Sequence, residues 1–157
     1  MHEGHIAQRV VNSIQVLAFS DADFAGCLDT QRSTTGAHLC IEGKLSHFPI
    51  HSMSKRQDST ASSIPEAEIV AADTVLRHML VPRLDIWDML RQTGPNTLRG
   101  VLREYHDACM KVIQSGCTPT MLHLHRVHGV SIMVLHEIAG DGINAFLWML
   151  STPPLMT

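Results

Sequence analysis

The chain is poor in aromatic residues and has no excess of basic charge. Phe, Trp and Tyr make up only 4% of its 157 residues, so a core has to be built from Leu, Ile, Val, Met and Ala. The formal net charge is −3. A nucleic-acid partner would therefore have to be bound by a local basic patch, because the protein as a whole does not attract phosphates.

The sequence also lacks the marks of export and of a membrane span. Its first residues do not show the basic-then-apolar pattern of a secretory signal, and no apolar run approaches the roughly 20 residues that cross a bilayer. None of the four cysteines stands in a CxxC pair, which favours reduced thiols. These absences predict an intracellular protein, cytoplasmic or nuclear, that is neither secreted nor bound to a membrane.

Hydrophobic patterning predicts a single α/β domain that begins with three strands. The strands are expected at residues 14–21, 35–42 and 45–53, with Gly43-Lys44 as a hairpin turn between the last two. Pro49 in the third run indicates an edge strand or a bulge, because proline cannot donate to a β ladder.

The clearest helix begins at Ser63, in a sequence of the capping-box type, Ser63-Ile64-Pro65-Glu66. Its apolar residues recur as far as Leu80, and Pro82 is expected to stop or kink it before a short helix at 84–90. The later elements are then predicted as a strand at 98–102, a helix at 105–114 ended by Gly116, and a fifth strand at 131–138.

Glu68 is the most informative residue of the long helix. By helical spacing it shares the apolar face of Ile64, Ala72 and Val75, whereas Glu66, Asp73 and Arg77 fall on a polar face. A carboxylate on a core-facing side is costly unless it is paired, hydrogen-bonded or bound to metal. The alternative is that Glu68 lies at the margin of the apolar stripe and reaches solvent. Asp21, at the end of the first strand, is the natural partner carboxylate for a hard cation.

Two long, ordered motifs give the chain a resemblance to a known family. Residues 19–36 read FSDADFAGCLDTQRSTTG, and residues 53–72 read MSKRQDSTASSIPEAEIVAA. Both resemble the ribonuclease H region of copia-type retrotransposon Pol polyproteins, and weaker matches follow at 101–115 and 118–137. The resemblance implies a ribonuclease H-like fold, in which helices flank a mixed sheet of five strands. It covers residues 14–138, leaving 1–13 as an extension and 139–157 as a tail expected to be disordered or unrelated.

The family resemblance also implies a reaction and a site. Such domains use carboxylates on the first strand, first helix and fourth strand to bind two Mg²⁺ or Mn²⁺ ions, which cleave the RNA of an RNA–DNA hybrid. By position Asp21 and Glu68 match the first two ligands. The aligned place of the third holds Tyr105-His106, and the last acidic ligand, expected near 128–131, is missing as well.

Two neighbouring carboxylates could replace the missing third ligand. Asp107 could turn in from the start of a helix, which makes it the third candidate catalytic residue. Glu104 is expected to aim away from Asp21, because a one-residue shift along a strand reverses the face. The sequence therefore predicts a degenerate retrotransposon copy with impaired catalysis. The alternative is an active nuclease that uses Asp21, Glu68 and either Asp107 or Glu104. The resemblance implies an RNA–DNA hybrid or another nucleic acid as the partner, which the degenerate copy would at most bind weakly, or it would serve no cellular role. The oligomeric state is left open.

Histidines and basic residues offer weaker signals. A zinc site is one interpretation of four histidines: His123, His125, His128 and His136. On a strand, His123 and His125 would share one face and could bind the same ion. The favoured interpretation is that these imidazoles are exposed or hydrogen-bonded. Lys55-Arg56, Lys111 and Arg126 are possible phosphate contacts, although this number of surface charges is ordinary.

Overall fold

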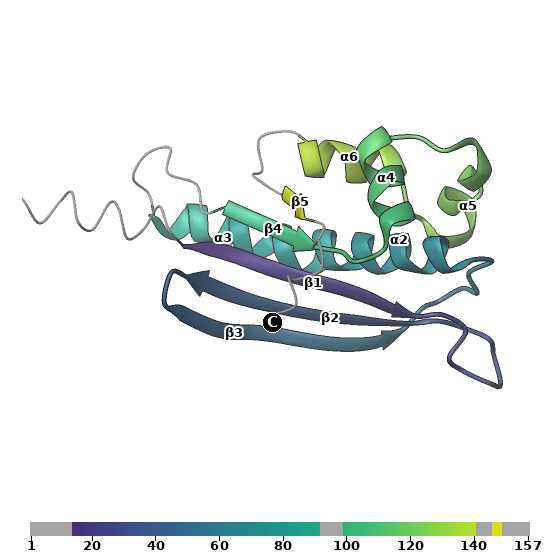
Figure 1. Cartoon of the computed structure of the whole chain (residues 1–157), viewed down its shortest axis with the longest axis horizontal. Coiled ribbons are helices and arrows are strands. Elements are labelled where there is room, and N and C mark those ends of the chain that lie inside the picture. Colours follow the sequence, from purple (N-terminus) through teal and green to yellow (C-terminus); the bar gives the residue numbers. More distant parts are fainter. Residues whose placement is uncertain (1–13, 92–98, 141–145, 149–157) are drawn as a thin grey trace, which may run out of the picture.

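A computed structural model describes residues 14–91, 99–140 and 146–148 (Figure 1). The strands are β1 (Gln15–Asp23), β2 (Thr34–Gly43), β3 (Ser46–Arg56), β4 (Arg99–Arg103) and β5 (Phe146–Trp148). The helices are α2 (Ile64–Val75), the π-helical turn η1 (Leu76–Leu80), α3 (Val81–Arg91), α4 (Asp107–Ser115), the 3-10 turn η2 (Pro119–Met121), α5 (Leu124–His128) and α6 (Ile132–Gly140). No helix of the described parts is long and apolar enough to cross a membrane.

The strands form one mixed sheet in the order β3-β2-β1-β4-β5. β1 to β3 make an antiparallel meander, and β4 joins β1 in parallel, with Leu17 opposite Val101. β3 is the outer strand, and its register shifts opposite Leu39 and Cys40, where Pro49 pairs with Cys40. The expected edge strand and the expected bulge are therefore both present. In Figure 1 the meander forms the lower layer and α4, α5 and α6 gather above it.

The mixed sheet with flanking helices agrees with the expected fold class, but one predicted strand is wrong. Residues 131–138 were expected to form the fifth strand, and the structure has helix α6 at Ile132–Gly140 instead. Four strands of five residues or more make up the body of the sheet. The three-residue β5 adds to β4 from within the segment expected as an unrelated tail.

Helix α2 begins as its capping sequence predicts. Ser63 has an extended backbone, and its hydroxyl accepts a hydrogen bond from the N–H of Glu66. Of the stop or kink expected at Pro82, the stop is wrong, because η1 and α3 continue the helical path without a loop. Pro82 has no N–H to donate to the carbonyl of His78, and the side chain of Arg83 donates to that oxygen instead, at 2.7 Å. The widened turn η1 lies immediately before this point, where such helices commonly adjust.

The two faces of the sheet carry two different clusters. Val16, Ala18 and Leu39 face α2 and join the main core, whereas Leu17, Cys40 and Val101 form a smaller cluster with Phe19. Since successive residues of a strand alternate between faces, the smaller cluster lies on the side of the sheet opposite α2. This alternation decides where each candidate site residue points.

Candidate functional site

Asp21 lies on the sheet face that α2 does not cover. It follows Leu17 and Phe19 at alternate positions of β1, and its side chain is exposed. Around it is an open hollow whose lining includes Phe19, Gly36, His38 and Tyr105. The side chain of Tyr105 is 60% exposed and lies near Asp21. It stands at the position where the family resemblance implies the third carboxylate.

Glu68 is buried on α2, so the alternative of a solvent-reaching side chain is wrong. It is 7% exposed, and its Oε2 has no hydrogen-bond partner. Burial, followed by the charges of Glu104 and Asp21, raises the pKa of Glu68 to about 7, against a smaller opposing effect of the Ala22 N–H. The carboxyl group is therefore protonated in a large part of the molecules at neutral pH.

Glu104 follows β4 directly and is directed to the covered side of the sheet. One of its oxygens accepts a hydrogen bond from the Ser20 hydroxyl at 2.6 Å, and the other accepts from the N–H groups of Tyr105 and His106, each at 3.0 Å. Ser20 is buried and precedes the exposed Asp21, so the Glu104 carboxyl shares the Ser20 face. Burial raises the pKa of Glu104, and its hydrogen bonds oppose that rise.

Asp107 is the remaining candidate. It is an exposed residue in the first turn of α4, where it favours the positive end of the helix dipole; His106 is the N-cap. An acidic residue at this position has a structural role without any metal.

The carboxylates do not fit a two-metal centre as they are placed. Asp21 points to the open face, Glu68 and Glu104 lie on the covered side, and both oxygens of Glu104 already accept hydrogen bonds. Within the described ranges, the only three His, Cys, Asp or Glu side chains whose ligand atoms lie within 4.8 Å of one another are His38, Cys40 and His47. Two bridging cations would need carboxylates from several elements converging on a space about 4 Å wide.

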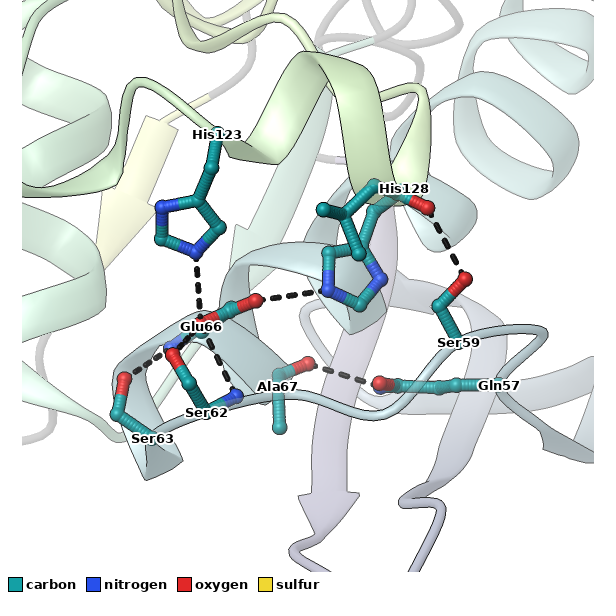
Figure 2. Close-up of polar contacts among 9 residues, drawn as sticks. Gln57, Ser59, Ser62, Ser63, Glu66, Ala67, His123 and His128 are labelled. Carbon is teal, nitrogen blue, oxygen red and sulfur yellow. Dashed lines mark hydrogen bonds and ion pairs between the residues drawn. The ribbon is translucent and has the colours of Figure 1, made fainter.

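Sequence reasoning missed a second carboxylate site on α2, built around Glu66 (Figure 2). Glu66 was expected on a polar face but is 1% exposed. Its Oε1 lies 2.8 Å from Nε2 of His128, and its Oε2 lies 3.2 Å from Nε2 of His123. The backbone N–H and the hydroxyl of Ser62 also donate to Oε2.

These contacts balance the burial of Glu66. Burial acts to raise its pKa, but the hydrogen bonds from Ser62, His123 and His128 outweigh it and lower the pKa to about 2. Glu66 therefore links the start of α2 to α5 through an ionised carboxylate. His123 is the N-cap of α5 and His128 lies in that helix, so neither is on a strand. The strand face that the predicted zinc site requires is therefore absent at these two residues, which are partners of Glu66 instead.

Several residues of the two sequence motifs also have structural roles. The side chain of Gln57, 5% exposed, donates to the carbonyl of Ala67 at 2.9 Å and to the hydroxyl of Thr35 at 3.2 Å, which joins the end of β3 to α2 and β2. Ser33 is fully buried and its hydroxyl accepts from the N–H of Ala25, closing the loop after β1. The motifs thus encode loop and strand-end packing as well as carboxylates.

Asp73, also assigned to a polar face, is buried and pairs with Arg77 at 2.8 Å.

Lys55 and Arg56 are exposed at the end of β3, where Lys55 lies 3.8 Å from Asp58. The two basic side chains are therefore accessible to a phosphate on the surface near the loop that leads to α2.

Comparison with known proteins identifies the fold. No protein-family model matches the chain, and no curated protein is similar to it. Among solved structures, a ribonuclease H1 isolated from compost by a metagenomic approach superimposes with a TM-score of 0.56 and 13% sequence identity. The alignment covers 87% of this chain and 84% of that one. The chain therefore has the ribonuclease H-like fold, as the sequence motifs predicted.

Proposed function

We propose that this chain is a ribonuclease H-like domain derived from a copia-type retrotransposon Pol polyprotein, impaired in metal-dependent cleavage. The fold and the two motifs support the origin. The impairment is supported by one observation above all: among the described residues, no three of the Asp21, Glu68, Glu104 and Asp107 side chains have carboxylate oxygens within 4.8 Å of one another, although the charges of Glu104 and Asp21 raise the pKa of Glu68.

The proposed partner is an RNA–DNA hybrid or another nucleic acid, bound weakly. With a net charge of −3, binding depends on local groups such as Lys55 and Arg56 near the end of β3. The alternative, an active nuclease that uses Asp21, Glu68 and Glu104 or Asp107 with Mg²⁺ or Mn²⁺, draws support from the unpartnered buried oxygen of Glu68. That oxygen has a free lone pair with which it could bind a cation.

Cleavage of a labelled RNA–DNA hybrid with Mg²⁺ or Mn²⁺ tests the proposal. The folded wild-type chain is expected to show no cleavage above that of its Asp21→Asn and Glu68→Gln variants. Metal-dependent cleavage by the wild type that both substitutions abolish would establish the alternative. Binding of the hybrid is measured separately in the presence of a chelator, which removes the metal and prevents cleavage. Loss of cleavage is thereby distinguished from loss of binding.

A gain-of-function pair sharpens this test. Tyr105→Asp places a carboxylate on the Asp21 face, at the position that the family gives to its third ligand, while Tyr105→Asn has the same shape without the charge. Cleavage or Mg²⁺ binding that appears in Tyr105→Asp and not in Tyr105→Asn would show that the missing carboxylate at position 105 causes the loss of activity.

A further inference from the structure

A second group of potential ligands lies on the β2–β3 hairpin, where His38 also lines the hollow beside Asp21. His38 and Cys40 occupy alternate positions of β2, and His47 comes from the start of β3. One ligand atom from each lies within 4.8 Å of those of the other two. His38 and Cys40 flank Leu39, a residue of the main core, so the group lies on the open face of the sheet, opposite α2.

The two imidazoles are arranged by the surrounding hairpin. The rings of His38 and His47 are nearly parallel, at 20°, with their centroids 6.3 Å apart. Nδ1 of His38 lies 2.8 Å from the hydroxyl of Ser52, its cross-strand neighbour. A contact of this kind fixes the ring and leaves Nε2 as the nitrogen that would bind an ion, in the way that metal-ligating histidines are oriented by an outer partner.

The thiol completes a donor set of one sulfur and two nitrogens. Cys40 is fully buried in the small cluster with Leu17 and Val101, whereas His47 is exposed, so an ion would enter from the solvent side past His47. We infer that His38, Cys40 and His47 bind a zinc ion, with the fourth position left to water or to Glu42. Zinc takes thiolate and imidazole ligands at about 2.0–2.3 Å in tetrahedral geometry.

The geometry requires only a small closure. Tetrahedral bonds of that length place ligand atoms about 3.5 Å apart, so ligand atoms that lie within 4.8 Å of one another have to approach by at most about 1.3 Å. Glu42 stands two residues after Cys40 on the same face and pairs in register with His47; Gln15 donates to its carboxylate at 3.0 Å. A divalent ion bound by one thiolate and two neutral imidazoles keeps one positive charge, which the carboxylate of Glu42 would offset. The bound ion would cross-link β3 to β2.

This site is independent of the proposed nuclease-like function, and metal binding tests it directly. Tag-free protein is titrated with Zn²⁺ and, separately, with Co²⁺, whose thiolate complexes show charge-transfer absorption. One ion per chain is expected, with thiolate absorption for Co²⁺. His47→Ala, which changes an exposed residue, is expected to weaken binding at least tenfold, and Cys40→Ser to abolish the thiolate absorption.

Matched controls separate this site from the other histidines and cysteines. His51→Ala changes another exposed histidine of β3, paired with Leu39, and Cys117→Ala changes an exposed cysteine; neither is expected to alter binding. The inference is overturned if the wild type shows no thiolate absorption, or if His47→Ala and His51→Ala bind equally well. Since His47 is exposed, that comparison holds even where Cys40→Ser fails to fold.

Discussion

Two glutamates on one helix, two residues apart, lie in opposite electrostatic settings. Glu66 is buried among donors from Ser62, His123 and His128, and its pKa is lowered to about 2. Glu68 is buried beside Glu104 and near Asp21, with one oxygen unpartnered, and its pKa is raised to about 7. Burial alone thus does not determine whether a carboxylate stabilises the fold; the charge and donors around it do.

This comparison separates a carboxylate that stabilises the fold from one that is a candidate metal ligand. The Glu66 site has all the partners that an ionised carboxylate needs, so it stabilises the fold as it stands. The Glu68 site has the negative charges of Glu104 and Asp21 beside a buried oxygen without a hydrogen-bond partner, a setting that a bound cation would stabilise. Four substitutions test the contrast.

Removing the charge of Glu66 is expected to have the largest effect. Glu66→Gln should lower the free energy of unfolding by about 3 kcal/mol at pH 7, because the folded state holds the ionised form. The pKa is lower in the folded chain, so this stability is present above about pH 4.5 and is lost as the pH falls towards 2. Urea denaturation at pH 7 and pH 3 checks it, with the exposed Glu137→Gln as control. An equal loss at both pH values would contradict the ionic account.

Removing the charge of Glu68 is expected to have the opposite sign. Glu68→Gln should raise the free energy of unfolding by about 2 kcal/mol at pH 8, less than the full pKa shift implies because the amide still buries a polar group. The pKa is higher in the folded chain, so the wild type is most stable below about pH 4.5 and loses that stability as the pH rises through 7. The gain should therefore be small at pH 5. A destabilised variant at pH 8 would show that the ionised carboxylate is favourably bound.

The two histidines that contact Glu66 give the smallest effects, and they should differ. The side chain of His128 is 2% exposed, and that of His123 is 43% exposed. His128→Gln is expected to cost about 1.5 kcal/mol and His123→Gln less than about 0.5 kcal/mol, because an exposed partner is screened by water. Thermal denaturation of both variants at pH 7 measures the difference. Equal losses would mean that exposure does not decide the strength of these contacts.

The parts of the fold that depend on short-range patterns were predictable. The meander β1 to β3, the N-cap Ser63 and the helix end at Gly116 all follow from alternation, a capping hydroxyl and a glycine in the left-handed region, at φ 71°. Helix α6 differs from the strand that the sequence predicts, because a short segment rich in apolar and β-branched residues has no clear period. In the structure only Leu135 of that helix is fully buried.

The candidate site was predictable only in part. The burial of Glu68 follows from its position on the apolar face, but the burial of Glu66 and Asp73 does not. Helix α2 is covered by the sheet on one side and by α5 near its start. A prediction that only one face of the helix is buried therefore misses the burial of Glu66. The partner of Glu66, His128, lies 62 residues away in the sequence, and no local signal connects the two.

Pro49 has a consequence for how this protein behaves at high concentration. β3 is eleven residues long, lies at the rim of the sheet and carries the exposed side chains of Phe48 and Ile50. A strand of this kind offers its unpaired backbone as a template for another chain. Pro49 removes one backbone donor from the middle of the strand. The register shift beside it interrupts the regular ladder, and the positive charges of Lys55 and Arg56 would repel those of an identical edge. We expect these features to oppose pairing of β3 with another copy of the chain.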